Sequence, residues 1–386
     1  MSPRVLTVTA LLAAIAACAY FFLSADPSPH AAVAEPESRG SVAPPASQPA
    51  GAAGTQPADG TPSGKSAKSH GVNWKRFAAI MGAADGSGEA MPKPSPEDVA
   101  RFLAKRGETA VNLVAAFETT RDRRLLDRAL ELFPNSPIVL MAAIEAAPQN
   151  AAKAGEKYAP DAERIAMIEK FKAADPNNPL PWIFSAQELF KAGPNDEAIA
   201  DIRAALDHPA FYTYSTERMD SAQRLYEDMG LDPTEAGLLA MAGLALPHMS
   251  AANQTSRMLM EWQTKATDSG DAAAADEALR LTYSLGRTFA TPEASRTLIG
   301  QLVGISMESR ALKALPADAQ PSWLNNVNPA QRLAEMEKAK QDVKEITAGF
   351  EWVIQTQDEA VLSEYLRRMR NDGESAAFGW LKTQKK

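Results

Sequence analysis

A proline–asparagine motif occurs twice in the chain, as PNSP at residues 134–137 and as PNNP at residues 176–179. Each copy follows one apolar run with helical spacing and precedes another. Proline cannot continue a helix but is favoured at its first turn. The two copies divide this region into segments 103–136, 137–178 and 179–212, of which the outer two are 34 residues long. A 34-residue period that holds two helices predicts an array of helical hairpins.

The third of these segments has the clearest internal pattern. Large and small apolar residues alternate at helical spacing in its two halves, as Trp182, Ala186 and Leu189, and then Ala198, Ile202 and Ala205. Small residues let paired helices approach closely, while large ones fill the space between neighbouring pairs. The residues 195–197 (NDE) supply capping oxygens and first-turn acids for the second helix.

This pattern resembles the tetratricopeptide repeat. The first segment resembles it more loosely, through Ala110, Leu113, Leu126, Ala129 and Pro134, with Arg106 and Asp122 where the family has Trp and Ala. The resemblance extends over about 103–212 and implies an α-solenoid whose concave surface is lined by the first helix of each repeat. It places five candidate partner-groove residues there, namely Met141, Glu145, Gln187, Phe190 and Lys191. For Met141 and Phe190, filling of the core is the competing interpretation.

The remainder of the chain is also predicted to be helical, since apolar residues recur at three- and four-residue spacing and strand-like alternation is absent. A helix starts at the SPED sequence of residues 95–98. Residues 216–246 predict a degenerate fourth helix pair. Longer helices follow over 250–315 and from residue 329, and Gly300 and Gly304 predict close packing between helices in a bundle. We recognise no family in 213–386. The predicted fold is all-α, with tetratricopeptide-like repeats over 95–247 and a C-terminal helical domain over 248–386.

The amino-terminal segment 1–23 predicts a membrane anchor. Nineteen uncharged residues, Val5 to Leu23, follow Arg4, which is just long enough for a membrane-spanning helix with the folded domain exported. Two alternatives remain open, cleavage after Ala25 as a signal peptide and lipidation of Cys18. Residues 24–94 are rich in Ala, Pro, Gly and Ser. Such a segment has few large apolar side chains to bury, so we predict that it is a disordered linker.

Composition excludes several function classes. The net charge of −8 and the pI near 5.3 disfavour nucleic acid, which selects basic surfaces. Cys18 is the only cysteine, so neither an intramolecular disulfide nor a thiolate zinc site can form. The four histidines are scattered, and no phosphate loop or nucleophile motif is present. We expect no catalytic, cofactor-binding or metal-binding residues.

One enzyme family shares two features with this chain. Lytic transglycosylases combine an exported helical superhelix with a catalytic glutamate that precedes a serine, and the chain has Glu308-Ser309 and Glu374-Ser375. Only twelve residues follow Glu374, and the family's glycine-rich substrate motif is missing after Glu308. Both pairs are therefore predicted to be ordinary helix-surface residues.

The sequence predicts a non-enzymatic scaffold, tethered to the membrane in the cell envelope, that binds a protein or peptide partner through its helical-repeat surface. The alternative is an envelope glycan-cleaving enzyme, or an accessory to a hydrolase, that uses a carboxylate in 213–386. A deep pocket that holds two carboxylates of raised pKa would favour the enzyme, whereas an open groove would favour the scaffold. The sequence leaves the partner and the oligomeric state open.

Overall fold

The computed structural model describes residues 72, 74, 92–147, 158, 160–193, 196–208, 211–244, 246–290, 297–316, 319–325 and 327–384. All regular structure in these residues is helical, with fifteen α-helices and no strand. The predicted all-α class is therefore confirmed. None of the helices in this part of the chain is both long and apolar enough to span a bilayer. The predicted anchor 1–23 and Cys18 lie outside the described residues.

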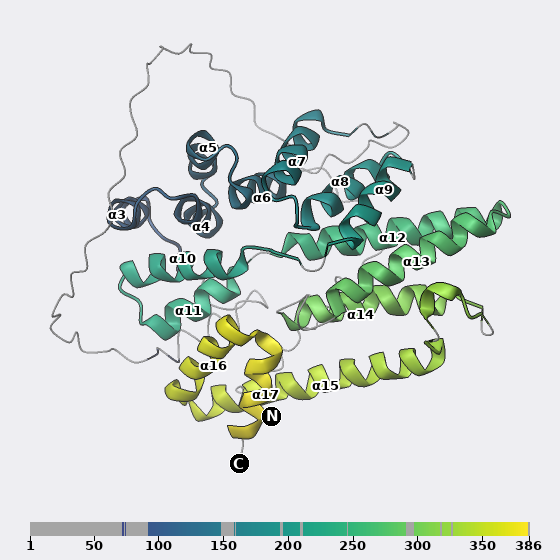
Figure 1. Ribbon diagram of the computed structural model, residues 1–386. Coiled ribbons are helices and arrows are strands. Elements are labelled where there is room, and N and C mark those ends of the chain that lie inside the picture. The colour runs from purple at the N-terminus through teal and green to yellow at the C-terminus, as the bar shows by residue number, and fades with distance from the viewer. Residues whose placement is uncertain are drawn as a thin grey trace, which may run out of the picture.

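Short helices in consecutive pairs form the first half of the fold (Figure 1). They are α3 (Pro96–Arg106), α4 (Ala110–Thr120), α5 (Arg123–Leu132), α6 (Pro137–Ala146), α7 (Ala162–Ala174), α8 (Leu180–Phe190) and α9 (Asp196–Leu206). From α4 to α9, each helix packs against the next along the chain. The predicted start of α3 is confirmed, because Ser95 and Asp98 form a reciprocal capping box.

The two proline–asparagine motifs lie in the turns that open α6 and α8. Pro137 is the first residue of α6, and Pro179 immediately precedes α8. The Asn178 side chain is buried, accepts a hydrogen bond from the backbone N–H of Leu180 and donates to the carbonyl oxygen of Tyr212 at 2.7 Å. The second motif therefore joins the start of α8 to the segment that leads into the second half of the fold.

Longer helices form the second half. They are α10 (Ser215–Asp228), α11 (Pro233–Ala242), α12 (Pro247–Asp268), α13 (Ala272–Ala290), α14 (Leu298–Lys313), α15 (Pro329–Thr356), α16 (Glu359–Asp372) and α17 (Glu374–Gln384), with a 3-10 turn at Ser322–Leu324. Helix α10 packs on α3 and α4, and α12 packs on α8. Figure 1 shows α10 and α12 beneath the first seven helices, and α15 to α17 farther below. Helices α4 and α8 thus have neighbours in both layers.

The main core contains residues from both sides of the domain boundary predicted between residues 247 and 248. One cluster of buried residues combines Leu140, Ile168 and Phe184 from the first half with Ala252 and Met307 from the second. The segments 95–247 and 248–386 therefore share their main core, although smaller clusters lie within each segment alone. The sequence could not reveal this, because periodicity identifies the buried face of a helix but not the element that covers it.

The predicted disordered linker 24–94 also needs a correction at its end. Most of it lies outside the described residues, but Val72 is 6% exposed and belongs to a second core cluster. Trp74 packs against the same cluster, which contains Leu362 of α16 and Phe378 of α17. The linker prediction therefore fails at these two positions, because each supplies an apolar side chain that the C-terminal helices can bury.

Helices α13 and α14 meet at two glycines. A Cβ atom on Gly304 would lie 2.5 Å from the backbone nitrogen of Ala290, and one on Gly286 would lie 2.5 Å from that of Glu308. The close packing predicted for Gly304 is confirmed, whereas its partner Gly286 was not predicted. Since backbone rather than a flexible side chain occupies both places, only glycine fits without a shift of the two helices.

Gly304→Ala should destabilise the protein by about 3 kcal/mol, because the added methyl group forces the backbones of α13 and α14 apart. Gly379→Ala is the matched control, since Gly379 lies within α17 and a Cβ there would meet nothing within 4 Å. That control should be neutral or raise stability slightly, as alanine favours the helix. Urea unfolding of both variants measures the difference, and equal stabilities would contradict the glycine contact.

A second substitution tests the packing of α8 on α9. Ala198 is fully buried in a cluster with Ala186 and Phe190, so Ala198→Leu should cost roughly 1–3 kcal/mol and lower the melting temperature by several degrees. Ala200 is exposed on the same helix, and Ala200→Leu should leave the melting temperature nearly unchanged. If both variants melt like the wild type, the tight contact between the two helices is wrong.

Candidate functional site

The five predicted partner-groove residues differ in how far they are covered. Four of them are hidden from solvent or nearly so, with Met141 0% exposed, Gln187 1%, Phe190 5% and the Glu145 side chain 9%, while the Lys191 side chain is 18% exposed. Met141 belongs to the main core and Phe190 to the cluster between α8 and α9. Four of the five side chains are thus covered by the chain itself, whereas Lys191 stays partly exposed.

A buried ion-pair cluster centred on Arg218 joins the layers. The Arg218 side chain, on α10, is 1% exposed. Its guanidinium donates two hydrogen bonds to the Glu118 carboxylate of α4, one of them from Nε at 3.1 Å. One of its nitrogens also lies 3.6 Å from an oxygen of Glu145 on α6. A single cation thus faces carboxylates from two helices of the first layer, which is a fixed and specific contact.

Among the described residues, several buried polar atoms of this cluster have no hydrogen-bond partner. The Oε1 of Glu145, Nη1 of Arg218 and Nδ1 of His248 are buried without a hydrogen-bond partner. Burial raises the pKa of Glu145 to about 8, and Glu118 adds to this effect while Arg218 opposes it. Burial and the charge of Arg218 lower the pKa of His248 to about 3. The cluster therefore favours one shared cation, a protonated Glu145 and a neutral imidazole.

A second buried pair follows along the same interface. Arg164 of α7 contacts Glu188 of α8 at 3.1 Å, and both side chains are almost completely buried. Arg164 also donates to the carbonyl oxygen of Ile144, while Glu188 accepts hydrogen bonds from Tyr158 and Lys191. Each charge has a partner of opposite sign, and the carbonyl of α6 is tied to α7. This pair acts as a structural connection between neighbouring helices.

The two glutamates of the enzyme alternative also have structural roles. Glu308 is 0% exposed and pairs with Arg332 of α15 at 2.9 Å. Glu374 accepts a hydrogen bond from the backbone N–H of Leu298 at 2.7 Å and so caps the start of α14. Burial raises the pKa of both carboxyls. The prediction that they are surface residues was wrong, because each lies where two elements of the second half pack together.

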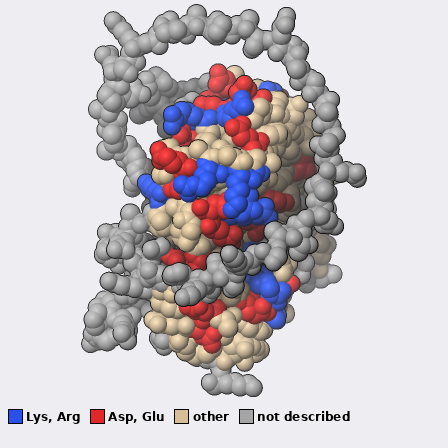
Figure 2. Space-filling model, turned by 90° about the vertical axis from the view of Figure 1, so that its left-hand side faces the viewer, with Lys and Arg blue, Asp and Glu red and all other residues tan. Residues whose placement is uncertain are grey.

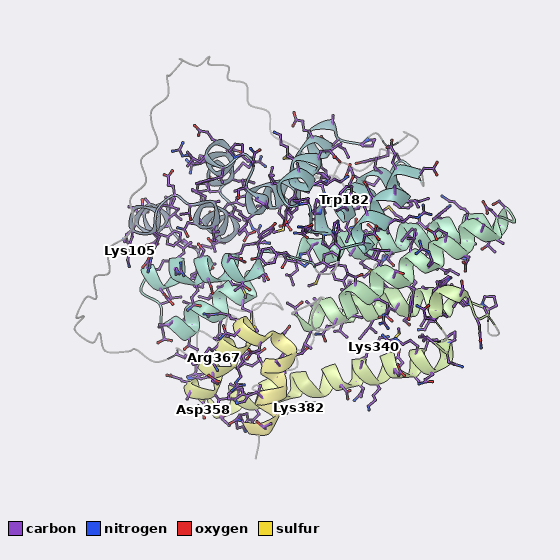
Figure 3. The ribbon with its side chains drawn as sticks, in the orientation of Figure 1. Lys105, Trp182, Lys340, Asp358, Arg367 and Lys382 are labelled. Atoms are coloured by element: carbon purple, nitrogen blue, oxygen red, sulfur yellow. The ribbon has the colours of Figure 1, made fainter. Side chains whose placement is uncertain are left out.

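The two hollows described for the molecule open to the surface, and neither is lined by Glu308 or Glu374. One, of about 680 Å³, lies between α3 and the α4–α5 hairpin. It is lined by Pro94, Pro96, Val99, Ala100, Leu103, Ala104, Glu108, Thr120, Asp122, Arg124 and Leu125. The other, of about 420 Å³, lies between α11 and α16 and includes Arg367 (Figure 3). The first hollow is the more apolar and is the candidate binding site.

The charges around the first hollow are already paired within the chain. Arg124 contacts Asp122 at 2.7 Å, Arg128 contacts Glu108 at 3.1 Å, and a third pair joins Arg101 to Asp98 across one turn of α3. Figure 2 shows that side chains of opposite sign alternate in bands over the face on the α3 side of the molecule. The hollow therefore offers an apolar floor without a strong net charge around it.

Comparison with known proteins adds no family. No family model, no curated protein and no solved structure matches the chain. Among the described residues, no group of three or more His, Cys, Asp or Glu side chains could hold a metal ion.

Sequence reasoning missed Arg218, Glu118 and His248. One signal was available for the cation, since Arg218 is the only basic residue in the first turn of α10, where the helix dipole disfavours positive charge. A buried anion elsewhere would explain that placement. The identity of the anions could not be read from the sequence, because Glu118 lies 100 positions away.

The pH dependence of stability tests the protonated Glu145. The folded protein keeps a proton that the unfolded chain releases between its ordinary pKa of 4.5 and about 8. The free energy of unfolding should therefore fall as pH rises through this window, by at most about 1.4 kcal/mol per pH unit. His248 acts oppositely, since the unfolded imidazole binds a proton below 6.5 and the folded one only near 3, so its contribution falls as pH drops through that range. The two effects offset each other between 4.5 and 6.5, so the net losses of stability lie above 6.5 and below 4.5.

Glu145→Gln should remove most of the decline between pH 6.5 and 8, leave the loss below pH 4.5 unchanged, and make stability rise with pH between 4.5 and 6.5, where only His248 then acts. Urea unfolding at half-unit pH intervals measures both arms. Glu131→Gln is the control, because the Glu131 side chain is 69% exposed and should follow the wild-type curve. An unaltered alkaline decline in Glu145→Gln would show that another group causes it.

Proposed function

We propose that the protein is a non-enzymatic scaffold of the cell envelope that binds a protein or peptide partner. In this proposal, residues 1–23 anchor the chain in the membrane, the folded part is exported, and the hairpins α4–α5, α6–α7 and α8–α9 form a tetratricopeptide-like α-solenoid. The stepwise packing of each helix on the next supports this arrangement.

The observation that carries the proposal is the open apolar hollow between α3 and the α4–α5 hairpin. Its floor is formed by Val99, Leu103 and Leu125, and its edge by Pro94 and Pro96. An accessible concave surface of this kind can bury small apolar side chains of a partner. Since the surrounding charges are paired within the chain, the best partner is an uncharged apolar peptide segment rather than an acidic or basic one.

The inner surface of α4, α6 and α8 is not assigned to the partner. Displacing α10 would separate the buried Arg218 guanidinium from the Glu118 carboxylate and from the Glu145 side chain, which is costly in a buried setting. A partner that binds the outer hollow leaves those ion pairs intact. The proposal therefore separates the parts that hold the fold together from the part that binds.

Site-specific photocrosslinking in intact cells tests this function. A crosslinking amino acid at Ala104, an exposed residue of the hollow, should capture one predominant protein or peptide. The same amino acid at Ala273, an exposed alanine of α13, is the matched control and should not capture it. Leu103→Glu should reduce the capture at least tenfold, since it places a charge on the apolar floor.

The melting temperature of Leu103→Glu must stay close to that of the wild type for the loss to count. Equal capture from Ala104 and Ala273, or capture that survives the substitution, would contradict the proposed site. Both arms use the full chain, so the result does not depend on how the amino-terminal segment is processed.

A further inference from the structure

Two apolar residues that precede the helical body are packed on its last helices. Val72 is 6% exposed, and its carbonyl oxygen accepts a hydrogen bond from the backbone N–H of Trp74 at 2.9 Å. Both side chains belong with a cluster built from five helices of the second half, α11, α14, α15, α16 and α17. The buried members of that cluster are Leu238, Leu298, Val353, Leu362, Tyr365, Leu366, Ala377, Phe378 and Leu381.

This contact joins positions that are far apart in the sequence. Val72 precedes every described helix of the first layer, yet most buried members of its cluster, Leu362 and Leu381 among them, lie on α16 and α17. Figure 1 shows α3 and α16–α17 in different parts of the molecule, with α10 and α11 between them. Figure 3 marks the same separation by Lys105 on α3 and Lys382 on α17. The chain thus contacts the C-terminal helices before it reaches α3.

The apolar surface of α16 and α17 would be incomplete without these residues. Tyr365 and Phe378 pack edge to face with ring centroids 5.0 Å apart, and Val72 and Trp74 add further apolar area to the same cluster. A two-helix unit is too small to bury a large core alone. A side chain of the size of tryptophan contributes substantially to such a cluster, because it removes a large apolar area from water.

We infer that Val72 and Trp74 form an amino-terminal clamp, an intramolecular interaction in which the chain's own apolar segment occupies the surface of α16 and α17. The clamp fixes the point at which the preceding chain leaves the folded body. That point lies at the α16–α17 end, not at the start of α3. The predicted linker 24–94 would then have a fixed contact with the body at residues 72 and 74.

The clamp has a consequence that rests on the proposed function. If residues 1–23 anchor the chain, the α16–α17 end of the body is the one held closest to the membrane. The apolar hollow between α3 and α5 lies in the other part of the molecule (Figure 1). The clamp therefore joins the anchored segment to the body at a place away from the candidate binding site, which leaves that site accessible to partners.

Distances between spin labels test the clamp in the full-length protein. All variants carry Cys18→Ser, so that the only native cysteine does not react with the label. One label is attached at Ser69→Cys, three residues before Val72. The second is attached at Lys382→Cys on α17 or at Ala104→Cys on α3. The clamp predicts a short, narrow distance distribution for the pair 69–382 and a distinctly longer one for the pair 69–104.

Substitution of the clamp residues provides the second arm. Val72→Ala combined with Trp74→Ala should at least double the width of the 69–382 distribution, while Trp74→Phe should restore most of the order. Val42→Ala, in the preceding segment, is the matched control and should change neither distance. Hydrogen exchange on α4 to α9 verifies that the double variant remains folded there.

A 69–382 distribution as broad in the wild type as in the double variant would overturn the clamp. So would a shorter distance from residue 69 to residue 104 than to residue 382. Both measurements are made on purified protein without a partner. Failure of the clamp is therefore distinguishable from failure of the proposed function, which the crosslinking from Ala104 tests on its own.

Discussion

The buried guanidinium of Arg218 holds the two layers of the molecule in register. It lies on α10 and faces Glu118 of α4 and Glu145 of α6 at once. An arginine removed from water is costly unless carboxylates take the place of its solvent, so this contact admits only a narrow range of positions for α10. Helix α11 packs on α10, and α16 packs on α11. The placement of the C-terminal helices therefore depends on where this one cation is bound.

Further contacts at the middle and at the carboxyl end of α10 reinforce that position. Asp228 near its carboxyl end pairs with Lys105 and Arg106 of α3, and the Ser221 hydroxyl donates to the side-chain oxygen of Asn112 at 2.8 Å. Apolar contacts alone would allow α10 to shift along α4, because Ala115 and Ala222 are small side chains that do not interlock. Polar contacts at fixed sites specify the register that the small residues leave undefined. The covering of the inner surface is thus part of the folded structure.

The sequence predicted the elements better than their partners. Helix starts and turns follow from local chemistry, such as the Ser95 cap and the prolines before α6 and α8, and these were predicted. Arg218, Gly286 and Val72 were not predicted, because their roles depend on contacts with residues distant in the chain. Arg218 looks like part of a solvated helix face until Glu118 is placed beside it. The sequence predicted the start of α3, which lines the first hollow. It did not predict the hollow itself, because α3 and α5 are separate in the sequence.

The same reasoning explains why the predicted groove residues became core residues. Val114, Val139 and Ile183 are hidden, and so are most residues of α6 and α8 around their whole circumference. A helix that is apolar on all sides must be covered on all sides. Helix α6 is such a helix, because its seven consecutive residues Ile138 to Ile144 are all buried. A resemblance to a repeat that leaves one face open directs attention to that face, although the composition of α6 demands a second layer.

The buried ion pairs and the exposed ion pairs of this protein have different roles. Buried charges connect packed helices: Arg218 fixes α10 against the first layer, and Arg164 with Glu188 connects α7 to α8 within it. Exposed charges around the α3–α5 hollow are paired over short distances and contribute little to stability. A partner bound there would disturb only weak surface contacts, whereas one that entered between the layers would have to replace Arg218 and its carboxylates. The molecule can therefore accept a ligand on its outer face without any loss of the interactions on which its fold depends.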